Sequence, residues 1–288
     1  MIAKDLKDVP LKKRWRISIG DLFYNPKKVA AGSGAGFRAF VYHSVTARPV
    51  DNEWAEETIS KEAFDWQMGY LTDHKYNVIS AGEAVRYLTL GKTMPPRAVV
   101  ITFDDGYRDN YTNAFPVLKK YNFPATVFLT ADFLRDRSAD ERALSISEVK
   151  DMKRSGIIDF GCHGMTHRAL TQLDEARLEE EITGSRKRLA DILGEAPGLF
   201  AYPFGHVGSY NKGVIEKVKA AGFSGAYTAI FGSNSVGLDP FLMRRNRISW
   251  LDTRDEFAKH LAGAYDWYAL YQRFGAKRYH FDGGRRGE

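Results

Sequence analysis

Short continuous apolar runs alternate with segments of helical periodicity along most of this chain of 288 residues. A short run that is apolar throughout is typical of a strand buried on both faces of a sheet. Runs of this kind lie at residues 37–43, 76–80, 97–103, 125–130, 157–163, 199–203 and 223–228, and a further strand, rich in arginine, is predicted at 243–249.

The segments between these runs predict helices. Phe64, Met68 and Leu71 recur at a spacing of three to four residues, which is typical of a helix face that packs on a core. Ser80 and Glu83 form a capping box that opens a helix through residue 90. Further helices are predicted at residues 113–121, 147–155, 174–193 and 211–221, and a last one follows the cap formed by Thr253 and Glu256. Strands that alternate with helices predict a parallel sheet covered by helices, and the number of units favours a closed α/β barrel over an open sheet.

Polar side chains gather where these strands end. In such folds the chemistry collects at the carboxyl ends of the strands, so one presumed face carries them all. The first strand is followed by His43, the third by Asp104 and Asp105, and the fifth by His163 and then His167. Residues at the later strand ends are Pro203, Phe204, Gly205, Arg245, Arg247 and Trp250.

Each of these features has an ordinary explanation when it stands alone. An Asp-Gly pair is common in turns, and a single histidine at a strand end is usually a structural one. Together, however, two imidazoles and one carboxylate resemble a catalytic site for zinc or a related divalent ion. The second aspartate would then be free to act as a general base beside the ion, and a further imidazole could protonate a leaving amine.

Composition narrows the class of protein. The 44% hydrophobic and 27% charged residues are those of an ordinary globular protein. The net charge is +6, and much of the excess lies in residues 12–16 and 277–288. Such basic ends are usually solvated tails, but they could contact an anionic membrane surface or an acidic polymer. We find no nucleic-acid-binding motif.

The single cysteine, Cys162, leaves the redox compartment open. No apolar run approaches the length of a transmembrane helix, and the basic residues near the N-terminus precede no apolar segment of a secretory signal. We therefore expect a cytoplasmic protein, or an extracytoplasmic one if the sequence is a trimmed form. We divide the chain into an N-terminal extension and linker (1–35), a catalytic domain (36–262) and an aromatic and basic C-terminal extension (263–288).

Three motifs in order resemble those of polysaccharide deacetylases, the carbohydrate esterase family 4 or NodB-homology group. They are TFDDGY (102–107), HGMTH (163–167) and FAYPFG (200–205). VYHSV (41–45) and the residues around TFDDGY are most similar to the branch that deacetylates poly-N-acetylglucosamine in biofilms. The resemblance implies a distorted (β/α)7 barrel. It also implies that Asp104 is the general base and that Asp105, His163 and His167 bind the metal, most simply zinc, with cobalt, nickel or manganese as alternatives.

The resemblance also leads us to expect the catalytic acid in His43. Many family members place this histidine in a late Leu-x-His motif, which we do not find near the C-terminus of this chain. In the biofilm-type branch the strand order is permuted and the acid comes from the first strand, where His43 lies.

The chain departs from the family pattern in two places. Gly164 stands where the family usually has a serine or threonine that braces the metal-binding loop. Ala201 stands where many members carry an arginine that pairs with the base. Arg245 or Arg247 could supply that charge from another strand, or both could be solvated surface residues.

The resemblance implies an N-acetylated glycan as the substrate, with a free amine and acetate as products. We expect the substrate to meet Tyr107, Tyr202, Pro203, Phe204, Gly205, Arg245, Arg247 and Trp250, with the backbone N–H of Tyr107 facing the oxyanion. Tyr202 and Trp250 are the aromatic platforms that we favour. The alternatives are a deacetylase or deformylase of a small or lipid-linked sugar, and a carbohydrate-binding domain without activity.

Overall fold

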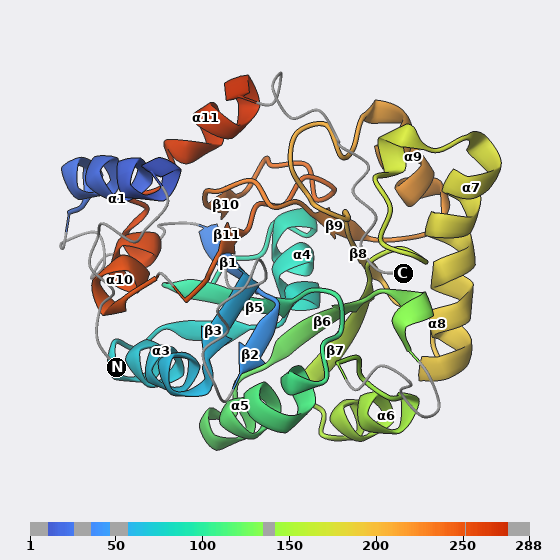
Figure 1. Cartoon of the computed structure of the whole chain (residues 1–288), viewed down its shortest axis with the longest axis horizontal. Helices are drawn as coiled ribbons and strands as arrows, with labels where there is room; N and C mark the ends of the chain where they lie inside the picture. Colours follow the sequence, from blue (N-terminus) through green and yellow to red (C-terminus); the bar gives the residue numbers. More distant parts are fainter. Residues whose placement is uncertain (1–10, 26–35, 47–56, 135–141, 251, 276–288) are drawn as a thin grey trace.

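A curled, mostly parallel sheet lies at the centre of the protein, and helices cover its outer side (Figure 1). The structure is a computed structural model, and it describes residues 11–25, 36–46, 57–134, 142–250 and 252–275. The predicted linker around residues 30–36 lies mostly outside these ranges.

The sheet is built from the predicted apolar runs. Strands β1 (Gly36–Tyr42), β5 (Ala98–Phe103) and β6 (Ala125–Leu129) are buried at every residue, which is why their sequences do not alternate between apolar and polar positions. In the sheet the order is β1-β5-β6-β7-β8-β9, all parallel, and β4 pairs with the first half of β5. The bounds of the other strands are β4 (Asn77–Ile79), β7 (Ile158–Cys162), β8 (Leu199–Ala201) and β9 (Gly225–Tyr227).

One segment joins the last strand of the sheet back to the first. Met243 forms a parallel bridge with Tyr227 of β9, and β11 (Asn246–Arg247) pairs in parallel with β1. The short strand β10 (Asn234–Ser235) pairs antiparallel with the start of β1. The sheet therefore closes on itself as a distorted (β/α) barrel, as the sequence predicted.

The helices lie close to their predicted positions. Both capping interactions are present: Ser80 and Glu83 bond reciprocally, and the Thr253 side chain accepts a hydrogen bond from the Glu256 N–H. The helices around the barrel are α3 (Lys61–Asp73), α4 (Ala81–Thr89), α5 (Phe115–Tyr121), α6 (Ile146–Arg154), α7 (Glu175–Glu179), α8 (Ser185–Leu193), α9 (Lys212–Ala220) and α10 (Arg254–Ala262).

Several local predictions were wrong. The predicted helix at 113–121 begins with a π-helical turn, η3 (Asn110–Ala114), before α5, in whose first turn Pro116 lies. The long helix predicted at 174–193 is interrupted by a second π-helical turn, η6 (Glu180–Gly184), between α7 and α8. The strand predicted at 243–249 shrinks to the two residues of β11. The paired strands β2 (Ser44–Thr46) and β3 (Thr58–Ser60) were missed because three residues are too short for a periodic pattern.

The helix α10 is not the last one, because α11 (Tyr268–Gly275) follows it. The N-terminal extension also contains a helix, α1 (Leu11–Phe23), which packs against α10. In this contact Arg16 is buried and its Nη2 lies 3.2 Å from Oδ1 of Asp252. Figure 1 shows α1, α10 and α11 together at one corner of the molecule. The N-terminal extension is therefore tied to the barrel, and its boundary at residue 35 stays a prediction.

Candidate active site

The two adjacent aspartates form a tight turn at the carboxyl end of β5. The Asp104 N–H donates to the Tyr42 carbonyl at 3.0 Å, so the residue still belongs to the sheet. Asp105 then adopts a left-handed conformation with φ +70°, and Gly106 follows at φ +84°. A non-glycine residue with positive φ is strained by about 1 kcal/mol or more, and such strain is concentrated at functional sites. The turn and the predicted chemistry therefore coexist, because the turn is what aims both carboxylates at the same edge.

One potential metal-ligand atom from each of Asp105, His163 and His167 lies within 4.8 Å of the other two. Oδ1 of Asp105 lies 3.4 Å from Nε2 of His167 and 3.7 Å from Nε2 of His163. The same oxygen is buried and accepts no hydrogen bond within the part of the chain that the structure describes. A buried carboxylate oxygen facing two imidazole nitrogens is costly without a cation, so these residues fit a divalent ion.

The ring of His163 is oriented by the neighbouring strand. Its Nδ1 lies 2.8 Å from the carbonyl oxygen of Ala201, so this nitrogen carries the proton and donates it. The lone pair is then left on Nε2, which faces Asp105. Burial lowers the pKa of His163 to about 4, against the opposing effect of Asp104, so the ring is neutral near pH 7. A neutral, oriented imidazole is the form that binds a metal.

The loop that carries the two histidines is braced by a buried glutamate, Glu181, from η6. Its carboxylate accepts hydrogen bonds from the N–H of Met165 at 2.8 Å and from the N–H of Thr166 at 3.1 Å, and it also accepts the Thr166 hydroxyl. Gly164 has φ +83°, and a Cβ there would come within 2.8 Å of Glu181 Oε2. Sequence analysis missed Glu181, which lies in a run of three glutamates that looks like an ordinary solvated helix face.

Asp104 is paired with Arg245, which resolves the question that Ala201 raised. Nη1 of Arg245 lies 2.6 Å from Oδ1 of Asp104 and Nη2 lies 2.8 Å from Oδ2, a bidentate ion pair. Arg245 is fully buried, and its Nε donates to the Thr228 carbonyl at 2.9 Å. Arg245 is therefore not a solvated surface charge. Arg247, two residues later on β11, is half-buried.

The two aspartates have opposite electrostatic environments. Burial raises the pKa of Asp104, but the Arg245 guanidinium, helped by His163, outweighs burial and holds this pKa well below its usual range. Burial raises the pKa of Asp105 against the opposing effects of His163 and His43, and the negative charge of Asp104 adds to the rise. Only a cation at the metal-ligand atoms would favour the ionised form of Asp105 as strongly as Arg245 favours that of Asp104.

His43 lies beside the aspartates, as the permuted strand order led us to expect. One ligand atom each of His43, Glu57 and Asp105 lie within 4.8 Å of one another. Nδ1 of His43 is buried and has no hydrogen-bond partner within the described residues. The backbone carbonyl of His43 accepts a hydrogen bond from Nδ2 of Asn110 at 2.7 Å, which fixes the end of β1. Glu57 was not predicted, since it precedes a strand too short to recognise in the sequence.

The residues predicted to contact the substrate differ in how far the structure exposes them. Tyr202 is fully buried, its hydroxyl donates to the Phe241 carbonyl at 3.1 Å, and its ring stacks on Tyr210. It cannot present a face to a sugar, so that prediction was wrong. Phe204 is half-buried, has φ +63°, and its ring centroid lies 4.7 Å from that of His167. The structure describes the remaining ones as follows: Pro203 and Gly205 are buried, Tyr107 is half-buried, and Trp250 is 37% exposed.

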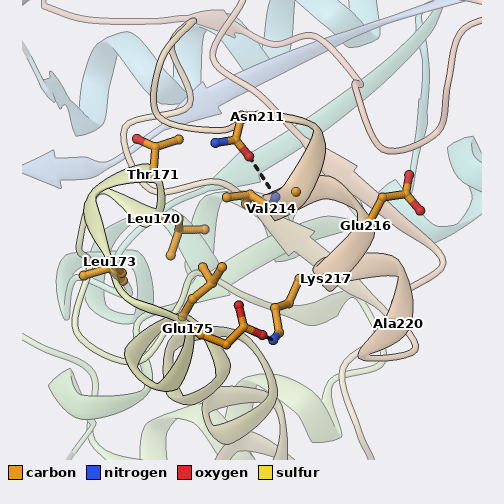
Figure 2. A pocket seen from close by; sticks show the side chains of 11 residues that line it. Leu170, Thr171, Leu173, Glu175, Asn211, Val214, Glu216, Lys217 and Ala220 are labelled. Atoms are coloured by element: carbon orange, nitrogen blue, oxygen red, sulfur yellow. Dashed lines mark hydrogen bonds and ion pairs between the residues drawn. The ribbon is translucent and has the colours of Figure 1, made fainter.

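A separate pocket of about 400 Å³ opens between η5 (Leu170–Gln172), α7 and α9 (Figure 2). Its polar groups are already engaged: Oδ1 of Asn211 accepts from the Val214 N–H at 3.0 Å, and Lys217 pairs with Glu175. Its lining, as the structure describes it, includes none of the predicted catalytic or metal-binding residues. The pocket therefore does not compete with the barrel edge as the candidate site.

Among the described residues, no helix is both long and apolar enough to cross a membrane.

Comparison with known proteins agrees with this geometry. Residues 91–226 match the family described as polysaccharide deacetylase. The protein YxkH of Bacillus subtilis (strain 168) is 30% identical over 191 residues, which are 66% of each chain. The poly-beta-1,6-N-acetyl-D-glucosamine N-deacetylase of Staphylococcus aureus (strain MSSA476) is 28% identical over 189 residues, which cover 62% of this chain and 63% of the relative. The chain thus spans just under two thirds of the length of these relatives.

The fold is shared with solved structures as well. The structure of IcaB from Ammonifex degensii superposes with a TM-score of 0.68 at 28% identity. The match covers 81% of this chain and 98% of that one.

Proposed function

Because the chain belongs to the polysaccharide deacetylase family through a domain of NodB type, we propose that it is a metal-dependent hydrolase of N-acetylated glycans. In this proposal it removes N-acetyl groups from a polysaccharide that contains N-acetylglucosamine and releases acetate.

One observation carries the proposal. Asp105, His163 and His167 place three metal-ligand atoms within 4.8 Å of one another, and Asp104 lies beside them in an ion pair that keeps it ionised. A domain that only binds sugars needs neither an orphaned buried carboxylate oxygen nor a second carboxylate at its side.

The roles of the residues follow from their chemistry. When bound, a divalent ion, for which zinc suits the two imidazoles and one carboxylate best, would lower the pKa of water and polarise the acetamide carbonyl. Asp104 accepts the proton of the attacking water, whose oxygen forms a bond to the acetyl carbon. As the C–N bond breaks, His43 donates a proton to the departing amine, which leaves a free amino sugar and acetate. Asp105, His163 and His167 hold the ion, and Arg245 keeps Asp104 in the form that can accept the proton.

The substrate class is supported by the relatives. The Staphylococcus aureus relative is named for poly-beta-1,6-N-acetyl-D-glucosamine, and the similarity, at 28% identity, covers 62% of this chain. We therefore propose a polymer of N-acetylglucosamine as the substrate of this chain. Trp250, which is partly exposed, remains our proposed aromatic contact for the sugar, and Phe204 packs beside His167 where it could border the acetamide.

The test is acetate release from N-acetylglucosamine oligomers by protein stripped with a chelator, with and without added zinc or cobalt. We expect release only after metal is restored. In Asp104→Asn, turnover should fall by about a hundredfold or more while metal is still bound. The exposed carboxylate of Asp73, changed in Asp73→Asn, provides a matched control that should keep full activity. Release without metal, or near-normal turnover by Asp104→Asn, would contradict the proposed mechanism.

A further inference from the structure

The helices α1 and α11 expose apolar side chains to an unusual degree. Among the described residues, nine large hydrophobic side chains are exposed, and five of them lie on these two helices. They are Trp15 (51% exposed), Leu22 (82%), Phe23 (57%), Leu270 (59%) and Phe274 (76%). Isolated exposed apolar residues are common on soluble proteins, but a cluster on adjacent elements marks an interaction site.

The exposed residues form ordered faces on both helices. On α1, Trp15, half-buried Ile19, Leu22 and Phe23 follow the i, i+4, i+7, i+8 spacing of a single apolar stripe. On α11, Leu270 and Phe274 follow the i, i+4 spacing. In an ordinary amphipathic helix such a stripe faces the core. We call these six residues the terminal-helix surface.

The inside-out orientation of α1 is fixed by its contacts with the barrel. Arg16, on the inner side, is 7% exposed and pairs with Asp252, and its guanidinium lies over the rings of Phe231 and Tyr265. A Cβ at Gly20 would come within 2.4 Å of the Tyr265 ring, so only glycine permits this close approach. The inner face therefore specifies a charged and a small residue, and the apolar stripe is left facing outward.

The two helices also contact each other. The ring of Trp15 lies 5.7 Å from those of Trp267 and Tyr271, in edge-to-face geometry. The helices α1 and α11 come from opposite ends of the chain and lie at the same corner of the molecule (Figure 1), and the Trp15–Tyr271 contact joins them there.

The positive charge of the protein is concentrated in the same two terminal segments. Residues 1–35 contain 8 Lys and Arg and 3 Asp and Glu, and residues 263–288 contain 5 and 3, which gives a net charge of +7. The whole chain is +6, so the barrel between these segments carries −1. An apolar surface within a strongly basic segment is typical of elements that lie in the interface of an anionic bilayer.

Other occupants fit this combination less well. A second copy of the chain would bring the same excess of positive charge to the contact and would be repelled. An acidic polymer would neutralise the charge but would leave the apolar side chains in water. We propose that the terminal-helix surface docks the protein on the surface of a membrane that contains anionic phospholipid, with the apolar side chains inserted among the headgroups.

Flotation with lipid vesicles tests this directly. The full, metal-loaded chain is mixed with vesicles of phosphatidylcholine, with or without phosphatidylglycerol, at low and high salt. We expect flotation with the anionic vesicles only, and weaker flotation at high salt because the charge attraction is screened. The triple variant Leu22→Ser, Leu270→Ser, Phe274→Ser should partition at least about a hundredfold more weakly, since three apolar side chains no longer leave water.

A matched control removes three exposed apolar side chains elsewhere, in Leu90→Ser, Phe133→Ser, Val236→Ser. This control should float like the unchanged protein, and both triple variants should keep their activity on soluble oligomers. Failure of the unchanged protein to float, or equal loss in both triple variants, would overturn the proposal. Binding to an acidic polysaccharide without binding to vesicles, or self-association that the first variant abolishes, would overturn it as well. Flotation is measured without turnover, so a failure to bind vesicles is distinguishable from a failure of the proposed function.

Discussion

The ion pair between Arg245 and Asp104 makes a testable prediction about pH. Arg245→Met keeps most of the side-chain volume but removes both charged hydrogen bonds, of 2.6 and 2.8 Å, from a carboxylate that is 4% exposed. Breaking a buried pair by removing one partner costs about 3–5 kcal/mol if the remaining charge stays buried and ionised. Asp104 can avoid part of this cost by taking up a proton, because burial alone raises its pKa.

The sign of the effect on stability reverses in the variant. In the unchanged protein the pKa of Asp104 is depressed, so its contribution to the free energy of unfolding is present above the usual aspartate pKa of about 3.9 and is lost at lower pH. In Arg245→Met the pKa of Asp104 rises above that value. The folded state then binds more protons than the unfolded state, and the variant loses stability as the pH rises.

Activity should follow the same titration. If Asp104 must be ionised to accept a proton, each unit by which its pKa exceeds the assay pH removes about tenfold of the active form. We therefore expect the acid limb of the kcat/KM profile to move to higher pH in Arg245→Met, with partial recovery of activity at alkaline pH.

The assays are a pH series of kcat/KM on N-acetylglucosamine oligomers and urea unfolding at the same pH values. Arg247→Met is the control, because it removes the neighbouring half-buried arginine and should leave the acid limb in place. In an Asp104→Asn background, Arg245→Met should destabilise the protein much less, since no buried carboxylate is left unpaired. A loss of activity that is the same at every pH would refute the reasoning and would assign Arg245 a purely structural role.

Three further predictions concern residues around the site. Glu181→Gln should weaken zinc binding by about ten- to a hundredfold, measured by competition with a fluorescent chelator, because an amide N–H2 then faces the N–H donors of the metal-binding loop; unchanged affinity would show that the loop needs no brace. Cys162 is fully buried, and burial raises its pKa to about 11, so iodoacetamide should label it only after unfolding, as followed by intact mass; fast labelling of the folded protein would contradict this. Tyr202→Phe should lower the free energy of unfolding by about 0.5–1.5 kcal/mol, because the carbonyl of the half-buried Phe241 loses its donor, while KM for oligomers stays the same. A several-fold rise in KM at unchanged stability would restore Tyr202 as a substrate contact.

The sequence was sufficient to predict the main parallel strands and the convergence of their polar ends. The run at residues 98–103 is apolar except for Thr102, a pattern typical of a fully buried strand, and the structure buries every one of its residues. Once parallel strands are accepted, their carboxyl ends share an edge, which places the aspartate pair and the two histidines of the HGMTH motif on the same face. Topology does not say which aspartate joins the histidines, and the choice of Asp105 was implied by the family resemblance.

Other features depend on how the chain packs around that edge. Arg245 and Arg247 are indistinguishable in sequence, and only the register of the closing segment, with Arg247 opposite Val41, decides which one faces Asp104. The apolar stripe of α1 has the spacing of a core-facing helix, yet a buried ion pair of Arg16 turns it outward. In both cases the deciding contact joins residues more than 100 positions apart, which no local pattern records.

The metal-binding loop shows how a contact from a later helical turn can replace a local one. The family resemblance implied a hydroxyl beside the first metal histidine as the brace, and Gly164 seemed to leave the loop without it. In the structure, the Glu181 carboxylate accepts hydrogen bonds from two backbone N–H groups of this loop and from a threonine hydroxyl. Glu181 lies 15 or 16 residues after the loop residues that it bonds. A Cβ at position 164 would come within 2.8 Å of that carboxylate, and the positive φ of +83° also favours glycine, so Gly164 leaves room for Glu181 where it lies. A buried carboxylate is costly unless its oxygens are hydrogen-bonded, and here the donors all come from the loop. The loop and Glu181 therefore stabilise each other, and Gly164 is a condition for that arrangement instead of a weakness of the site.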